Sequence, residues 1–215
     1  MPPLPWLDRI VHDLRGPLTP LQTAAYLLRR GQVDAARQPE LLDVIERQVR
    51  QLARMVEELG DWTRAGDGRL LGSREPSEPA LLLDYACVGA GQDIPAPLID
   101  DASDGVQVQG DPQRLTQLLS ILLGHAVARG NGRAPEVSVQ VRGPCLRIDV
   151  RDRGPTPDPL LLGRLLQEPQ SEPYDGGLGL RLLIARAIAE AHGGSLVAMA
   201  DADGGLRLRC ELPLA

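Results

Sequence analysis

The stretch LPWLDRIVHDLRGPLTPLQTAAYLLRR, residues 4–30, carries apolar side chains at alternating intervals of four and three residues. This spacing is typical of a coiled-coil seam, and it returns from Leu42 to Leu59 after a Gly-containing turn at residues 31–39. Two such helices joined by a short turn form an antiparallel hairpin, which alone buries only part of its apolar surface. The sequence therefore predicts a helical hairpin that completes a four-helix bundle as a homodimer. The predicted seam is formed by Leu7, Val11, Leu14, Leu18, Leu21, Ala25 and Leu28, then by Leu42, Ile45, Val49, Leu52, Val56 and Leu59.

The composition changes after the hairpin, where residues 65–79 are rich in Gly, Pro and Ser, as linkers are. Beyond them, helices alternate with short strands joined by short turns, which predicts an α+β layer of helices on a mostly antiparallel sheet. We expect a hairpin domain at 1–66, a linker at 67–79 and an α+β sandwich domain at 80–215. The expected helices are 79–88, 111–129 and 178–191, and the expected strands are 97–99, 106–109, 136–142, 145–151 and two more at the end of the chain.

The composition limits the classes of function. A net charge of −6 argues against a nucleic-acid surface, and the absence of a long apolar run predicts no membrane insertion and a cytoplasmic location. All cationic charge is Arg, and the absence of Phe predicts an aliphatic core. The three cysteines lack metal-ligand spacing, so we expect free thiols and no metal site of that kind.

A histidine and an acid stand together in the first predicted helix. His12 lies one step past the seam position Val11, so its imidazole should face water. A solvent-facing imidazole can act as a nucleophile, and Asp13 could hold or accept the proton on one ring nitrogen. The alternative interpretation is a solvated surface pair on a helical bundle.

The stretch HDLRGPLTP resembles the H box of sensor histidine kinases of two-component systems. In that family the histidine receives a phosphoryl group from ATP and passes it to an aspartate in the receiver domain of a response regulator. The resemblance implies that His12 is the phosphoacceptor and that Asp13 is its proton partner. Gly16 stands where the family often has Thr or Asn, thought to place a water for phosphatase action, which predicts weak phosphatase activity.

The resemblance also implies an ATP-binding domain of the Bergerat type in the second half of the chain. DGGLGLRLLIARAIAEAHGGSL, residues 175–196, resembles the second glycine box of these domains. Gly177 and Gly179 would let backbone amides approach the phosphates at a helix N-terminus. Asp175 replaces the family's first glycine and would put a negative charge near the polyphosphate. The alternative interpretation is a glycine turn before a helix.

VRDRGPTPDP, residues 150–159, resembles the first glycine box, whose aspartate accepts a hydrogen bond from the adenine amino group. Asp152 and Gly154 match this box, so the resemblance implies that both contact the nucleotide. Thr156 stands where a second glycine is usual.

The segment between the hairpin and the glycine boxes, residues 110–130, opens like the N box of the family, whose asparagines contribute to magnesium binding. Ile121 and His125 occupy the two positions where the family has asparagines, and Ala128 occupies the position of the family's lysine. Magnesium prefers hard oxygen ligands, so these departures predict weakened or lost binding of ATP with Mg. Arg129 follows the position of the lost lysine on the same helix face as His125 and could compensate in part, so both are candidate residues for binding the cofactor. The alternative is that His125 and Arg129 cap the solvent edge of a core helix.

Two functions remain open. The first is an ATP-dependent protein-histidine kinase that phosphorylates His12 and then a response regulator. The second is an ATP-independent phosphotransfer or docking protein that keeps His12 and Asp13 while the ATP-binding domain has degenerated. Because little chain precedes Leu4, we expect either a core cut from a longer kinase or a signal delivered by a separate sensor protein.

Overall fold

The computed structural model describes residues 7–31, 33–90, 94–103 and 105–214. Its chain divides into two compact units, which we describe separately. The first unit contains residues 1–60 and 170–180, and the second contains residues 61–169 and 181–215. The expected start of the first helix at Leu4 lies outside the described residues.

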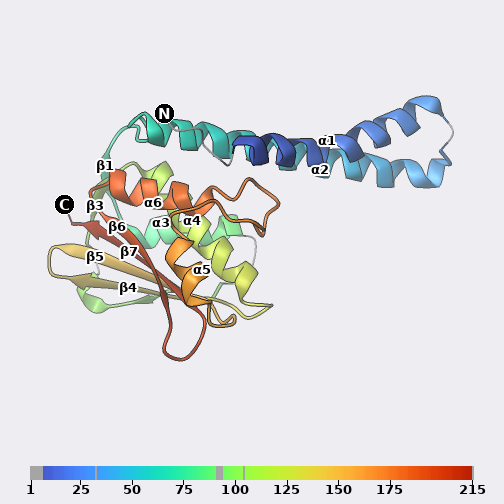
Figure 1. Cartoon of the computed structure of the whole chain (residues 1–215). Helices are drawn as coiled ribbons and strands as arrows, with labels where there is room; N and C mark the ends of the chain where they lie inside the picture. Colours follow the sequence, from blue (N-terminus) through green and yellow to red (C-terminus); the bar gives the residue numbers. More distant parts are fainter. Residues whose placement is uncertain (1–6, 32, 91–93, 104, 215) are drawn as a thin grey trace. The chain divides into compact units, whose positions relative to one another are not determined.

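The predicted hairpin is formed by helix α1 (Leu7–Arg30) and helix α2 (Gln38–Gly66), which run antiparallel, as Figure 1 shows. Helix α1 and residues 38–60 of α2 belong to the first unit, and the last residues of α2 belong to the second. The turn contains the short 3₁₀ helix η1 (Ala35–Arg37). Gly31 ends α1 with a φ of 63°, a left-handed conformation that favours glycine. The helical hairpin expected from the heptad spacing is confirmed.

The buried side of the hairpin differs from the predicted seam by one position. Ile10, Pro17 and Ala24 repeat every seven residues and are buried, as is Met55 of α2. A pair of helices can cover only one side of a broad apolar stripe, so part of the predicted seam stays exposed in the single chain. These exposed seam residues are Val11, Leu18, Ala25, Leu42, Val49 and Val56.

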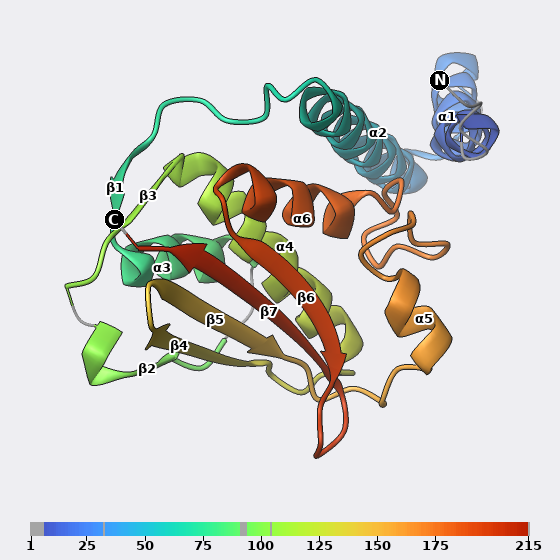
Figure 2. The ribbon, with the colours of Figure 1, turned by 60° about the vertical axis from the view of Figure 1, so that its left-hand side comes forward.

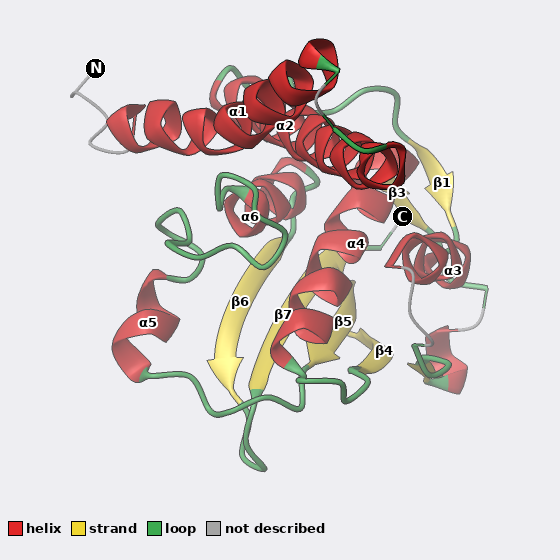
Figure 3. Ribbon diagram, turned by 90° about the vertical axis from the view of Figure 1, so that its right-hand side faces the viewer, coloured by secondary structure: helices red, strands yellow, loops and turns green. Residues whose placement is uncertain are grey.

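The second unit is built on a five-stranded sheet, visible in Figures 2 and 3. Its strand order is β2-β4-β5-β7-β6, with β2 parallel to β4 and every other neighbouring pair antiparallel. The mostly antiparallel sheet predicted from the sequence is thus confirmed. The strands are β2 (Leu98–Ile99), β4 (Glu136–Arg142), β5 (Cys145–Arg151), β6 (Ser195–Ala200) and β7 (Leu206–Pro213).

Three helices cover one face of this sheet (Figure 2): α3 (Pro79–Ala90), α4 (Pro112–Arg129) and α6 (Arg181–Ala191). The largest fully buried side chains are all Leu or Ile among the described residues, which confirms the predicted aliphatic core. The other face of the sheet carries ion pairs between β5 and β7, such as Asp149 with Arg209 at 2.7 Å.

Several short elements were not predicted. Strand β1 (Glu75–Ser77) lies within the predicted linker and pairs with β3 (Val108–Gly110), while helix α5 (Pro159–Arg164) lies in the Gly- and Pro-rich loop. The short 3₁₀ helix η2 (Asp101–Ser103) follows β2. Elements of three to six residues show too few periods for a hydrophobic pattern to identify them.

None of the described helices combines the length and the apolar character needed to cross a membrane.

Candidate phosphotransfer and nucleotide sites

His12 lies on the exposed side of α1 beside its predicted partner. The side chain of His12 is 88% exposed, and its Nδ1 lies 3.3 Å from Oδ1 of Asp13. Arg9 donates to the other carboxylate oxygen of Asp13, also at 3.3 Å. The contact from Arg9 orients the carboxylate of Asp13. The contact between Asp13 and Nδ1 of His12 favours the tautomer with the proton on Nδ1, which leaves a lone pair on Nε2. The expected pairing and exposure of His12 are both observed.

A cavity of about 270 Å³ opens beside His12 within the first unit. Its walls come from both helices of the hairpin and from the segment 170–180. We call it the His12 cavity. It is lined by His12, Asp13, Gly16, Pro17, Gln48, Gln51, Met55, Ser171, Pro173, Gly176 and Gly177. The phosphoacceptor candidate and two residues of the predicted second glycine box, Gly176 and Gly177, therefore share one cavity.

Hydrogen bonds to backbone carbonyls hold the segment 170–180 on the hairpin. From α2, Gln51 donates to the carbonyl of Gly176 at 2.7 Å, and Arg54 donates to the carbonyl of Asp175 at 3.2 Å. From α1, Arg9 donates to the carbonyls of residues 170 and 171 at 2.5 and 2.9 Å. These contacts use only main-chain atoms of the segment, so they depend on its backbone path and not on its side chains.

The glycine loop, residues 175–180, directs two backbone amides at one carboxylate. The N–H groups of Leu178 and Leu180 both donate to Oε2 of Glu58 on α2, each at 3.1 Å. A Cβ atom at residue 177 would lie 2.0 Å from Oε1 of Glu58, and one at residue 179 would lie 2.3 Å from the carbonyl oxygen of Gln170. Gly179 is thus required for the close approach of this loop to the backbone of residue 170, whereas a side chain at residue 177 would displace the carboxylate of Glu58. The amides of the loop bind an anionic group.

Asp175 has a local structural role at the start of this loop. Its Oδ1 accepts a hydrogen bond from the N–H of Gly177 at 3.1 Å, which stabilises the turn. A carboxylate at this position still adds negative charge close to the two amides of the glycine loop.

In the second unit, Asp152 is enclosed by donors from its own chain. The residue is 1% exposed, and Oδ1 accepts from the amides of Gly154 and Leu206 at 2.9 and 3.0 Å. Oδ2 accepts from Nε of Arg129 at 2.6 Å, and the same guanidinium donates to the carbonyl of Pro155 at 2.7 Å. An adenine amino group would have to share Oδ2 with Arg129 or displace it. The predicted residues Asp152, Gly154 and Arg129 do lie together.

Gly154 itself is sterically required, because a Cβ atom there would lie 2.3 Å from the carbonyl oxygen of Arg129.

The interpretation of His125 as a cap at the solvent edge is wrong, because His125 is 4% exposed and lies in the core side of α4. Burial and the positive charge of Arg129 lower the pKa of His125 from 6.5 to about 4, although the carboxylate of Asp152 acts in the opposite direction. The imidazole is therefore neutral near pH 7. The guanidinium of Arg129 pairs with the buried carboxylate of Asp152, and its contact with nucleotide stays a prediction.

The residues at the N-box positions do not fit a magnesium site. Ile121 is 1% exposed and apolar, and His125 is a buried neutral imidazole, so neither supplies the hard oxygen ligand that magnesium prefers. The described residues also contain no cluster of three or more His, Cys, Asp or Glu suited to a metal ion.

Arg114 and Gln117, which belong to the N-box segment, have a structural role: they bind the carboxylate of Asp61. Asp61 of α2 is buried, and Arg64, Arg114 and Gln117 donate to its carboxylate at 2.6, 2.7 and 2.5 Å. Burial alone would raise the pKa of Asp61, but the hydrogen bonds from Gln117, Arg64 and Arg114 hold it below its usual value. This cluster fixes the end of α2 to α4 within the second unit.

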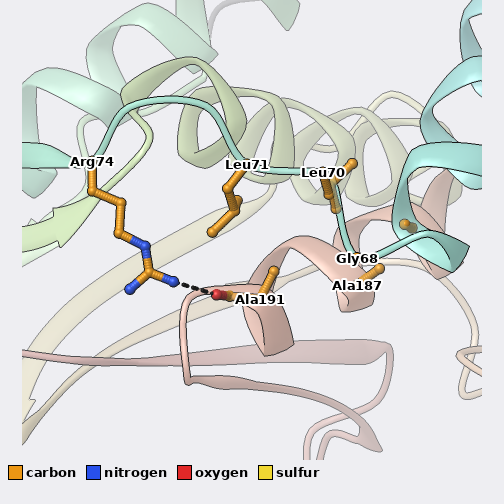
Figure 4. Close-up of a pocket in the computed structure, with 7 residues that line it drawn as sticks. Gly68, Leu70, Leu71, Arg74, Ala187 and Ala191 are labelled. Atoms are coloured by element: carbon orange, nitrogen blue, oxygen red, sulfur yellow. Dashed lines mark hydrogen bonds between the residues drawn. The ribbon is translucent and has the colours of Figure 1, made fainter.

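A second cavity, of about 410 Å³, lies between residues 65–74 and α6 (Figure 4). Leu70 and Leu71 line it, and Arg74 at its edge donates to the carbonyl of Ala191 at 2.7 Å. The lining contains no acid, histidine or nucleophile, so this cavity offers no chemistry of its own.

Comparison with protein families identifies both parts of the chain. Residues 6–68 match the His Kinase A (phospho-acceptor) domain. Residues 110–215 match the histidine kinase-, DNA gyrase B- and HSP90-like ATPase family. The chain belongs to the sensor histidine kinase family. The resemblance seen in the H box and the glycine boxes is confirmed at the level of the family.

This histidine kinase core resembles known kinases along nearly its whole length. It is 32% identical to the signal transduction histidine-protein kinase AfsQ2 of Streptomyces coelicolor, over 94% of this chain and 40% of that protein. It is 28% identical to BaeS of Escherichia coli, over 95% of this chain and 45% of that protein. The chain thus spans less than half the length of these two relatives.

Solved histidine kinases share the fold of this core. The kinase AdeS of Acinetobacter baumannii superimposes with a TM-score of 0.73 at 20% identity, over 94% of this chain and 98% of that one. The kinase ThkA, solved in complex with the response regulator protein TrrA, gives 0.72 at 20% identity, over 97% of this chain and 60% of that one. At such identities the likeness establishes the fold alone.

Sequence reasoning missed Glu58, Gln51 and Arg54, which hold the glycine loop on α2. Charged and amide residues outside the apolar seam of a helix are usually solvated, so no sequence signal distinguished them from surface residues.

Proposed function

We propose that this chain is the core of a two-component histidine kinase in which His12 accepts a phosphoryl group from ATP and donates it to an aspartate of a response regulator. The observation that carries the proposal is the exposed imidazole of His12, oriented by Asp13, within a segment that matches the phospho-acceptor family. The domain boundaries that go with it are residues 1–66 for the hairpin, 67–79 for the linker and 80–215 for the ATP-binding domain.

The chemistry follows from the tautomer of His12. With the proton on Nδ1 and shared with Asp13, Nε2 carries the nucleophilic lone pair. Attack by Nε2 forms a P–N bond while the bond from the γ-phosphorus to the bridging oxygen of ADP breaks. The Nδ1 proton then passes to Asp13, which removes the positive charge from the phosphorylated ring. Transfer to the receiver aspartate reverses these proton movements.

Each of the two units offers candidate groups for contact with nucleotide. The amides of residues 178 and 180, which bind a carboxylate in this structure, offer donors of the kind that phosphates accept. Asp152 offers an acceptor for the adenine amino group after Arg129 has moved from Oδ2. Because the N-box residues do not fit magnesium, no step is assigned to a metal ion.

A second candidate function is ATP-independent phosphotransfer, in which His12 takes its phosphoryl group from a phosphorylated receiver domain. The specific observations that favour it are the engagement of Asp152 by Arg129 and the presence of Ile121 and His125 at the N-box positions. In this case the ATP-type domain acts as a scaffold.

The proposed assembly is a homodimer in the cytoplasm, where ATP and response regulators are found. Its support is the row of exposed apolar residues on the hairpin: Val49 and Val56 are 50% and 63% exposed, and Val11 is 49% exposed. A second copy of the hairpin would cover this row and complete a four-helix bundle.

The deciding experiment is incubation of the full chain with γ-labelled ATP and magnesium, with His12→Gln as the control. Label that depends on His12 supports the kinase. A chain that takes no label from ATP but accepts phosphoryl on His12 from a panel of phosphorylated receiver domains is a phosphotransfer protein. If neither donor phosphorylates His12, both functions are wrong.

A further inference from the structure

The glycine loop offers its two amides to an anion, and in this structure the anion is a side chain of the same chain. Glu58 is 6% exposed, and one of its carboxylate oxygens accepts from both Leu178 and Leu180. A buried carboxylate is costly unless donors surround its charge, and these two bonds contribute to its stabilisation. The carboxylate therefore takes the place that the proposed function gives to a phosphate.

We infer that Glu58 competes with the nucleotide phosphates for the amides of Leu178 and Leu180, so that nucleotide can bind only after the glycine loop has left α2. This inference rests on the proposed function, because it assumes that the glycine loop binds the phosphates.

The geometry leaves no room for both anions. A Cβ atom at residue 177 would lie 2.0 Å from Oε1 of Glu58, so the carboxylate already fills the space above the loop. Two amides whose hydrogen bonds converge on one oxygen cannot also bind a phosphate oxygen, and the charges of carboxylate and phosphate repel each other. Each anion thus excludes the other.

The position of the glycine loop also affects the access of other molecules to His12. Gly176 and Gly177 form part of the His12 cavity, and Gln51 holds the carbonyl of Gly176 while Glu58 holds the amides that follow. When the loop leaves α2, this wall of the cavity leaves with it. Nucleotide binding is thereby coupled to the access of other molecules to His12.

Docking of the glycine loop on Glu58 should weaken the binding of nucleotide. If the loop is docked on Glu58 most of the time, only the remaining undocked fraction can bind nucleotide, and the apparent Kd rises in proportion. Removing the charge of Glu58 weakens the docked state, because hydrogen bonds to a charged acceptor are about twice as strong as neutral ones. Nucleotide should then bind more tightly, by roughly tenfold or more.

The test compares Glu58→Gln with the matched control Glu57→Gln, whose side chain on the same turn of α2 is exposed. ADP and ATP binding to the full chain are measured by calorimetry, and hydrogen exchange follows the amides of residues 178 and 180. We expect Glu58→Gln to bind nucleotide roughly tenfold more tightly than wild type and to exchange these amides faster, with Glu57→Gln like wild type.

The direction in which Glu58→Gln changes the nucleotide affinity separates competition from a merely structural contact. Competition predicts a higher affinity, whereas losing a structural contact would leave the affinity unchanged or lower it. Unchanged or weaker nucleotide binding by Glu58→Gln overturns the inference, and so does an absence of nucleotide binding in both proteins. Binding by Glu58→Gln alone supports it. The proposed function is tested separately, because acceptance of phosphoryl from receiver domains by His12 does not require nucleotide.

Discussion

His125 should make the folded chain sensitive to mild acid. Burial and the charge of Arg129 lower its pKa from 6.5 to about 4, whereas in the unfolded chain the imidazole titrates near 6.5. Between these values the unfolded chain binds more protons than the folded chain. The stability linked to neutral His125 is therefore fully present above pH 6.5 and is lost as the pH falls toward 4.

The size of the effect follows from the two pKa values. Each pKa unit is worth about 1.4 kcal/mol, so the difference between 6.5 and about 4 corresponds to roughly 3 kcal/mol at full effect. By pH 5 the loss should already reach about 2 kcal/mol. This is a large share of the stability of an ordinary domain.

The assay is urea unfolding of wild type and His125→Gln at pH 7 and pH 5, followed by far-UV circular dichroism. Wild type should lose about 2 kcal/mol more than the variant, which lacks the titrating ring. The chain has three histidines, so an NMR titration can follow each ring directly. An equal loss in both proteins, or a titration midpoint of His125 near 6.5, would refute the burial argument.

Three further predictions concern Arg129, Gly16 and Val49. Arg129→Ala leaves the buried carboxylate of Asp152 without its charged partner and should lower the free energy of unfolding by about 3 kcal/mol in urea unfolding; a loss below about 0.5 kcal/mol would contradict the pairing. Gly16→Thr, at a helical position with nothing within 4 Å of a new Cβ atom, should fold normally and speed the dephosphorylation of a phosphorylated receiver domain; rapid dephosphorylation by wild type would sink the prediction of weak phosphatase activity. Val49→Glu should convert the proposed dimer to monomers in sedimentation experiments, and a wild-type monomer would show that the exposed row has no partner copy.

The long elements of the fold could be predicted because their patterns repeat several times. The hairpin follows from the alternating spacing of its apolar residues, and β4 and β5 follow from the alternation of residues such as Leu146 and Ile148 with polar neighbours. The rotation of the buried stripe from Val11 to Ile10 could not be predicted, because heptad spacing shows the period of a stripe and not which side of it a single partner covers.

The sequence motifs indicated which residues form the candidate sites but not which contacts these residues make. The motifs indicated His12, Asp13 and the glycines, since each belongs to a short local pattern. The partners of these groups lie far away along the chain: Glu58 reaches Leu178 and Leu180 across about 120 residues. The burial of His125 was equally hidden, because a helical position between apolar and polar neighbours is compatible with either side of the boundary.

The most direct test of the central claim is to map the phosphorylated residue. The full chain and His12→Gln are treated with labelled ATP and, separately, with phosphorylated receiver domains, and the products are digested under neutral conditions for mass spectrometry. We predict a single acid-labile phosphoryl group on His12, absent from the variant. A phosphoryl group on any other residue, or none from either donor, would contradict the account.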